Sequence, residues 1–247
     1  MAGHSAWKNI KHKKAAADAK RGKAWSKCAR LIIVAAKTGG GDPESNLALR
    51  YAIDDAKAVN MPKDTIEKAI KKGTGELQAE SYESALYEGY GPGGAAILLD
   101  ILTDNRNRTA PEIKGIFDKH GGNLGTPGSV AYLFSKRGMV ALPKSAGDED
   151  DVMAAVLDAG ADDVVDAGES WQVLSDAAAL QAVRKACEAA GFAIEACELT
   201  MIPATTVAVG PDHARRLLNL VEALEDHDDV QKVYANFEVP DEVMAGL

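Results

Sequence analysis

Cysteines, aromatic residues and long apolar runs are scarce in this sequence of 247 residues. Cys28, Cys187 and Cys197 form no CxxC pair, which argues against a zinc knuckle and a thioredoxin-like redox site. Three scattered cysteines without a disulfide framework are typical of a reducing compartment. Apolar runs such as 31–36 are far too short to cross a bilayer, so no membrane contact is expected.

Targeting and catalytic motifs are absent as well. Basic residues fill the first thirty positions before any apolar stretch, which excludes a secretory signal and favours a cytoplasmic protein. The glycine-rich segments 87–94 and 120–125 lack the trailing Gly-Lys-Ser/Thr of a Walker loop, and neither a GxSxG elbow nor an HExxH helix occurs. We therefore predict that the chain is not an enzyme and holds no metal or cofactor.

Charge is abundant, and it is unevenly distributed. Residues 1–75 contain sixteen Lys and Arg against seven Asp and Glu, whereas residues 76–247 contain twelve against thirty. The net charge of −9 therefore combines a basic segment of +9 with an acidic segment of −18. This asymmetry predicts a polyanionic partner for the N-terminal segment, while the acidic remainder would repel nucleic acid.

The first thirty residues supply most of the candidate nucleic-acid contacts, and residues 1–22 are expected to form a mobile arm. Lys and Arg neutralise phosphates and release counterions, while Trp and His can stack on unpaired bases. The predicted contacts are His4, Trp7, Lys8, Lys11, His12, Lys13, Lys14, Lys20, Arg21, Lys23, Lys27 and Arg30. The alternative interpretation is a solvated basic tail without a partner.

A second candidate segment lies between a predicted strand and a predicted helix. Asn and Arg make bidentate contacts with bases and phosphates, and a helix N-terminus adds amide donors for an anion. The candidates are Asn105, Arg106, Asn107 and Arg108. Alternatively, Asn107 or Asp104 caps the helix and the arginines pair with acidic neighbours.

The apolar periodicity predicts an α+β fold that begins with a three-helix domain. Its helices are expected at 24–38, 47–60 and 61–73. Strands at 95–102, 130–134, 205–209 and 230–239, with helices at 109–120 and 212–225, would then give the ferredoxin-like order βαββαβ. The segment between 134 and 205 repeats the same order of strands and helices.

We therefore predict two ferredoxin-like α/β units, one inserted into the central hairpin of the other. The predicted domains are a basic arm plus three-helix domain (1–78), a discontinuous ferredoxin-like domain (79–135 and 203–247) and an inserted ferredoxin-like domain (136–202).

Six segments of the chain resemble the YebC/PmpR family. They are MAGHSAWKNIKHKKAAADAKRGK (1–23), GGGDPESN (39–46), NMPKDTIEKAIKKGTGE (60–76), YEGYGPGG (87–94), LTDNRNRT (102–109) and HGGNLGTPGSVAYLF (120–134). The resemblance implies three domains, a cytoplasmic location and nucleic-acid-linked regulation. The chain starts directly at the family motif without an Arg-rich transit extension, which favours the bacterial-type location.

Two functions remain open at this point. The family is described as probable transcriptional regulators that bind DNA, but the predicted helix 47–60 offers only Arg50 and Lys57 to read bases. Relatives also act at the ribosome and relieve stalling, and a basic arm on an acidic body suits ribosomal RNA. The expected partners are therefore DNA, ribosomal RNA or the ribosome, bound by a monomer. A nuclease built on Asp148 or Asp151 is disfavoured because no metal-ligand set accompanies them.

Overall fold

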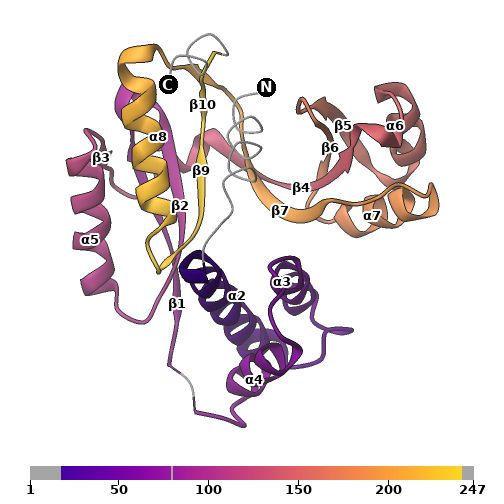
Figure 1. Ribbon diagram of the computed structural model, residues 1–247, viewed down its shortest axis with the longest axis horizontal. Helices are drawn as coiled ribbons and strands as arrows, with labels where there is room; N and C mark the ends of the chain where they lie inside the picture. The colour runs from indigo at the N-terminus through magenta and orange to yellow at the C-terminus, as the bar shows by residue number, and fades with distance from the viewer. Residues whose placement is uncertain (1–17, 79, 241–247) are drawn as a thin grey trace.

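In the computed structural model, the described part of the first unit is a bundle of three helices (Figure 1). The structure describes residues 18–78 and 80–240. The helices are α2 (Asp18–Gly39), α3 (Leu47–Ala58) and α4 (Lys63–Thr74), and one apolar cluster including Ile32, Leu49 and Ile66 joins them. α2 begins before the predicted residue 24, so residues 18–22 belong to a helix rather than to the arm. Gly22 costs only about 1 kcal/mol inside a helix, and packing elsewhere along α2 offsets that cost.

The turn between α2 and α3 is closed by the side chain of Asn46, which is buried. Its Oδ1 accepts a hydrogen bond from the backbone N–H of Leu49 at 3.1 Å and so caps α3. Its Nδ2 donates to the carbonyl oxygens of Ala35 and Gly40, both at 2.8 Å. The segment 39–46 thus forms a structural turn in which one amide side chain satisfies both helix ends.

The second unit is a four-stranded antiparallel sheet with two helices on one face (Figure 1). The strands are β1 (Glu83–Tyr90), β2 (Ala96–Thr103), β3 (Asn123–Leu124) and β9 (Val230–Ala235), in the order β3-β1-β2-β9. The helices are α5 (Arg106–Lys119) and α8 (Pro211–Glu225). Ile97 and Leu99 of β2 pack against Phe117 of α5 and Leu217 of α8, which forms the core of this unit.

One strand predicted for this unit is wrong, a second is only partly extended, and two strands, β1 and β3, were not predicted. Residues 131–133 form a short 3-10 helix, η2 (Ala131–Leu133), instead of a strand. In the predicted strand 205–209, only β8 (Val207–Ala208) is extended, and it pairs in parallel with β10 (Phe237–Glu238) outside the main sheet. The central position beside β2 is taken by β1, which precedes β2 through the short 3-10 helix η1 (Pro92–Gly94).

A buried carboxylate explains why the segment after residue 125 does not continue as a strand. Glu88 of β1 is 5% exposed, and its two oxygens accept the backbone N–H groups of Gly128, Val130 and Ala131, each at 2.7 Å. These N–H groups are therefore not available to a neighbouring strand. Burial alone would raise the pKa of Glu88, but the three backbone donors hold it below its ordinary value.

The third unit has the predicted order βαββαβ. It contains β4 (Phe134–Pro143), α6 (Glu149–Val156), β5 (Ala161–Asp166), β6 (Ser170–Asp176), α7 (Leu180–Ala189) and β7 (Ala196–Pro203), with short 3-10 helices η3 (Lys144–Ala146) and η4 (Leu157–Ala159). Its strand order is β5-β6-β4-β7, and all neighbours are antiparallel. The chain enters this unit after β3 and leaves it before β8. The α+β class and the insertion are thus confirmed, whereas the exact domain boundaries stay predictions.

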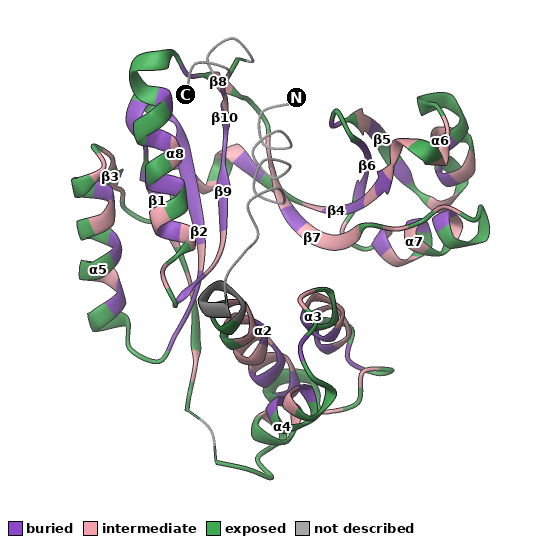
Figure 2. Cartoon of the chain, in the orientation of Figure 1, coloured by how far each residue is buried: buried purple, intermediate pink, exposed green. Residues whose placement is uncertain are grey.

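The three units contact one another pairwise, and most buried residues lie inside the individual units (Figure 2). One smaller buried cluster joins Leu98 and Tyr234 of the second unit to Phe134 of β4. β4 and β7 form the connection between the second and third units, paired from Phe134 opposite Pro203 to Ala141 opposite Ala196. Lys232 of β9 also binds Glu198 of β7 at 2.7 Å. No helix within the described residues has the length and apolar character needed to cross a membrane.

Candidate nucleic-acid interface

Three of the predicted nucleic-acid contacts lie on one side of α2 and reach the second unit. Lys23 Nζ donates to the carbonyl oxygen of Asp226 at 3.0 Å, and Lys27 Nζ donates to that of Glu225 at 2.6 Å. Both carbonyls lie at the C-terminal end of α8, where backbone acceptors lack helical partners and the helix dipole favours cations. In this structure, the α2 lysines therefore hold the end of α8.

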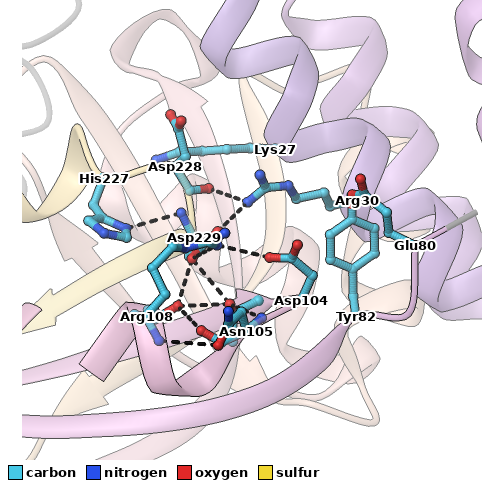
Figure 3. Close-up of polar contacts among 12 residues, drawn as sticks. Lys27, Arg30, Glu80, Tyr82, Asp104, Asn105, Arg108, His227, Asp228 and Asp229 are labelled. Atoms are coloured by element: carbon cyan, nitrogen blue, oxygen red, sulfur yellow. Dashed lines mark hydrogen bonds and ion pairs between the residues drawn. The ribbon is translucent and has the colours of Figure 1, made fainter. Parts of the chain in front are cut away.

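Arg30 completes this contact through the carboxylate of Asp229, which is 2% exposed. Arg30 Nη1 lies 2.8 Å from Asp229 Oδ1 and also donates to the carbonyl oxygen of Asp228 at 2.8 Å. Arg108 Nη2 of α5 binds the other oxygen, Oδ2, at 2.8 Å. Figure 3 shows both guanidinium groups converging on this carboxylate from α2 and α5. Asp229 therefore joins the first unit to both halves of the second.

Two buried hydroxyl groups supply the remaining hydrogen bonds of Asp229. Thr109 Oγ1 lies 2.7 Å from Oδ2, and Thr103 Oγ1 lies 3.1 Å from the same oxygen. Burial alone would raise the pKa of Asp229, but hydrogen bonds from Thr109, Arg108 and Thr103 outweigh burial and lower the pKa to about 2. The carboxylate is consequently ionised throughout the physiological range.

The predicted segment 105–108 lies at the start of α5, and most of its side chains have intramolecular partners. Asn105 caps the helix, because its Oδ1 accepts the backbone N–H of Arg108 at 3.2 Å. Arg106 Nε lies 2.9 Å from Glu83 Oε2, and its Nη2 donates to the carbonyl oxygen of Ser84. Arg108 also binds Asp104, at 2.8 Å. Asn107 is exposed. In this segment, the cap falls on Asn105 rather than on Asn107 or Asp104.

Replacing Asn105 by alanine is expected to lower the free energy of unfolding by about 1 kcal/mol, because the first turn of α5 loses its cap. Urea unfolding followed by circular dichroism would measure the change. Asn107→Ala is the matched control, since Asn107 is exposed on the same turn, and it should change stability by less than about 0.5 kcal/mol. Equal effects of the two substitutions would contradict the assigned cap.

A groove of about 620 Å³ lies between α2, α5 and the loop that follows α8. Its lining combines cationic side chains, including Lys23, Arg30 and Lys119, with acidic ones such as Glu112. His227 Nε2 lies 3.0 Å from Glu112 Oε2, while its Nδ1 accepts the backbone N–H of Asp229. The mixed charge favours neither an anion nor a cation in this groove.

Among the described residues, no group of three or more His, Cys, Asp and Glu is placed to hold a metal ion.

The remaining predicted contacts lie outside the described residues, either entirely or in their side chains. Lys20 and Arg21 belong to α2, but their side chains lie outside the described part of the chain. Seven further predicted contacts also lie outside it: His4, Trp7, Lys8, Lys11, His12, Lys13 and Lys14.

The outward side of α3 is occupied by the third unit. Tyr51 Oη accepts a hydrogen bond from Gln181 Nε2 of α7 at 2.6 Å, and Asp54 Oδ2 binds Arg184 Nη1 at 3.0 Å. The basic residues of α3 have partners too: Arg50 binds the carbonyl oxygen of Pro43, and Lys57 lies 3.6 Å from Asp54. α3 could therefore enter a DNA groove only if the first and third units separated.

Comparison with known families gives two matches that together span nearly all of the chain. A family model described as the TACO1/YebC protein N-terminal domain matches residues 5–76, and one described as the TACO1/YebC second and third domain matches residues 82–237. The chain belongs to the TACO1/YebC family. The family resemblance predicted from the sequence motifs is thereby confirmed.

Individual TACO1/YebC relatives are similar over their full lengths. A probable transcriptional regulatory protein of Geobacter sulfurreducens is 53% identical, with 100% of both chains covered. One of Citrifermentans bemidjiense is 53% identical, covering 99% of this chain and 98% of the relative. The crystal structure of a conserved hypothetical protein from Aquifex aeolicus is 46% identical, with a TM-score of 0.84, covering 94% of this chain and 96% of that one.

Sequence reasoning about this TACO1/YebC chain missed Asp229, although a signal was present. Four acids, Glu225, Asp226, Asp228 and Asp229, lie at or just beyond the end of α8, where the helix dipole disfavours negative charge. Acids in that position are stabilised when cations from elsewhere in the fold lie beside them. The basic side of α2 supplies these cations.

Proposed function

We propose that this chain is a nucleic-acid-binding regulator of gene expression that acts in transcription, in the cytoplasm, as a monomer and without catalysis. The observation that carries the proposal is the segregation of charge, +9 in residues 1–75 against −18 in the remainder. Relatives named probable transcriptional regulatory proteins support the regulatory role. A polyanion would be attracted to one end of the molecule and repelled by the rest.

The proposed contact element is the arm that precedes α2, rather than α3. Lys8, Lys11, Lys13 and Lys14 lie within eight positions of one another and would neutralise several phosphates. The contacts of Lys23 and Lys27 with the end of α8 support this assignment, because they engage basic side chains of α2 within the molecule. The arm would supply affinity through charge, and a preference for one base sequence would come from side chains that contact base edges.

The proposal is tested by comparing the full chain with a variant lacking residues 2–17, which leaves α2 complete. Binding to promoter duplex DNA, scrambled duplex DNA and purified ribosomes would be measured at 50 and 200 mM salt. If the arm contacts about six phosphates, the DNA affinity of the full chain should fall on the order of a thousandfold between the two salt concentrations. The truncated variant should bind more weakly and with a smaller salt dependence.

A variant lacking residues 241–247 controls for truncation itself, because it removes two acids and no base, and it should bind as the full chain does. Preference for promoter over scrambled DNA at 200 mM salt supports the transcriptional role. Retention on ribosomes at 200 mM salt, together with loss of DNA binding, would replace that role with one in translation. Absence of binding to DNA and ribosomes at 50 mM salt would overturn the proposal.

A further inference from the structure

The outer side of α4 carries three lysines that face solvent. Lys68, Lys71 and Lys72 are exposed, while Ile66 and Ala69 on the opposite side are buried in the core of the first unit. Positions three and four apart lie on the same face of a helix, so Lys68 adjoins both Lys71 and Lys72. We call these three side chains the α4 lysine face.

The location of α4 leaves this face accessible. α4 packs against α2 closely enough that a Cβ on Gly73 would lie 2.5 Å from the carbonyl oxygen of Ile33. The helix lies at the outer end of the first unit, away from the second and third units (Figure 1). The basic side of α2 contacts the second unit and the outward side of α3 contacts the third, whereas neither unit covers α4.

One pair of charges on α4 is unfavourable for the helix itself. Like charges four residues apart destabilise a helix, and Lys68 and Lys72 form such a pair. The chain also places opposite charges at this spacing: Lys63 lies 3.7 Å from Glu67 on α4 itself, Lys114 binds Asp118 at 2.8 Å on α5, and Arg184 binds Glu188 at 3.0 Å on α7. The helix dipole favours cations in the last turn, which suits Lys71 and Lys72, whereas Lys68 precedes that turn and lies four residues after Asp64.

We propose that the α4 lysine face is a second docking surface for the phosphate backbone of a nucleic acid, separate from the arm. This inference rests on the proposed function. Within the described residues, neither a hydrogen bond nor an ion pair engages the side chains of the three lysines, so they are available to phosphates. α2 has 22 residues and is about 33 Å long, and α4 packs beside its C-terminal half, while the arm precedes its first residue. A strand bound at both places would run along the first unit.

Lysines bind phosphates without reading bases, so this surface adds affinity and leaves sequence preference unchanged. Each phosphate contact contributes about 0.9 to the slope of log affinity against log salt concentration. Loss of all three lysines should therefore reduce that slope by about 2 to 3 and weaken binding to every sequence alike.

The test compares the full chain with a K68A/K71A/K72A variant on fluorescein-labelled duplex DNA of defined sequence, titrated from 50 to 200 mM salt. The matched control is K114A/K119A/K185A, which removes the same charge from exposed positions of the acidic units. We expect the slope to fall by about 2 to 3 only in the α4 variant. Thermal unfolding should show little destabilisation of α4 by its substitutions, because the helix propensity of alanine and the removed repulsion offset the lost interaction of Lys71 and Lys72 with the helix dipole.

The outcomes separate the two proposals. If the wild-type chain binds DNA and the α4 variant binds with the same affinity and slope, the α4 lysine face is not a docking surface, and the proposed function stands. An equal loss in the control variant would also overturn the inference, because it would assign the effect to net charge alone. If the wild-type chain binds neither this DNA nor ribosomes at 50 mM salt, the proposed function itself fails.

Discussion

Replacing Asp229 by alanine is expected to lower the free energy of unfolding by about 2 to 4 kcal/mol. The substitution removes a carboxylate that is 2% exposed and accepts hydrogen bonds from Arg30, Arg108, Thr103 and Thr109. Four donors would lose their common acceptor, and the two hydroxyls would stay buried with only partial compensation. Chemical unfolding followed by circular dichroism would measure the loss.

Asp228→Ala is the matched control for this prediction. Asp228 is exposed, and its side chain points away from the cluster in Figure 3, while its carbonyl oxygen accepts from Arg30 in either case. The control should change stability by less than about 0.5 kcal/mol. A large loss in both variants would mean that net charge near the end of α8, rather than the buried carboxylate, determines stability.

The pH dependence gives a second check on the same residue. Asp229 has a folded pKa of about 2, below the value of about 3.9 expected in an unfolded chain. Its ionised form therefore stabilises the fold fully above about pH 4, and this contribution is lost as the pH falls towards 2. The difference in stability between wild type and Asp229→Ala should accordingly shrink over that interval.

Replacing Glu88 by alanine should also cost about 2 to 4 kcal/mol, for a different reason. Three backbone N–H groups, those of Gly128, Val130 and Ala131, would lose an ionised acceptor, and the hydrogen bond of Val130 is buried. Hydrogen exchange at residues 125–133 should become much faster, because these bonds fix the course of that segment.

Glu83→Ala is the control for Glu88 on the same strand. Glu83 pairs with Arg106 at the surface, so its removal should cost less than about 1 kcal/mol and leave exchange at 125–133 unchanged. Slow exchange in the Glu88 variant would show that packing of Val130, rather than the carboxylate, holds the segment in place.

The sequence predicted the helices and the inserted unit because both depend on local periodicity and capping. The strand predicted at 130–134 illustrates where this reasoning ends. Its apolar residues suit a strand. However, the backbone N–H of Val130 donates to the carboxylate of Glu88, which lies 42 positions earlier in the chain. β1 was missed for a related reason: Glu83, Glu88 and Gly89 weaken its strand pattern, and pairing with β2 compensates.

In the candidate site, too, the sequence pointed to individual residues but not to the partners that they contact. Arg30 and Arg108 were predicted as nucleic-acid contacts, and in the structure both bind Asp229, which lies 199 and 121 positions away. No periodicity links residues so distant, because the fold alone brings α2, α5 and the end of α8 together. Only the topology shows that the chain itself supplies a carboxylate to both arginines.

The insertion of the third unit also sets the order in which the chain can become structured during its synthesis. Ala96 and Asn236 are hydrogen-bonded neighbours, yet 140 positions separate them. The strand β2 therefore emerges with one edge unpaired, and the whole third unit is made before β9 can cover that edge. The nascent third unit contains all of its own sheet and can fold first, whereas the second unit closes only when translation is nearly complete. Until then, β2 has an unpaired edge at which another chain could pair and start aggregation.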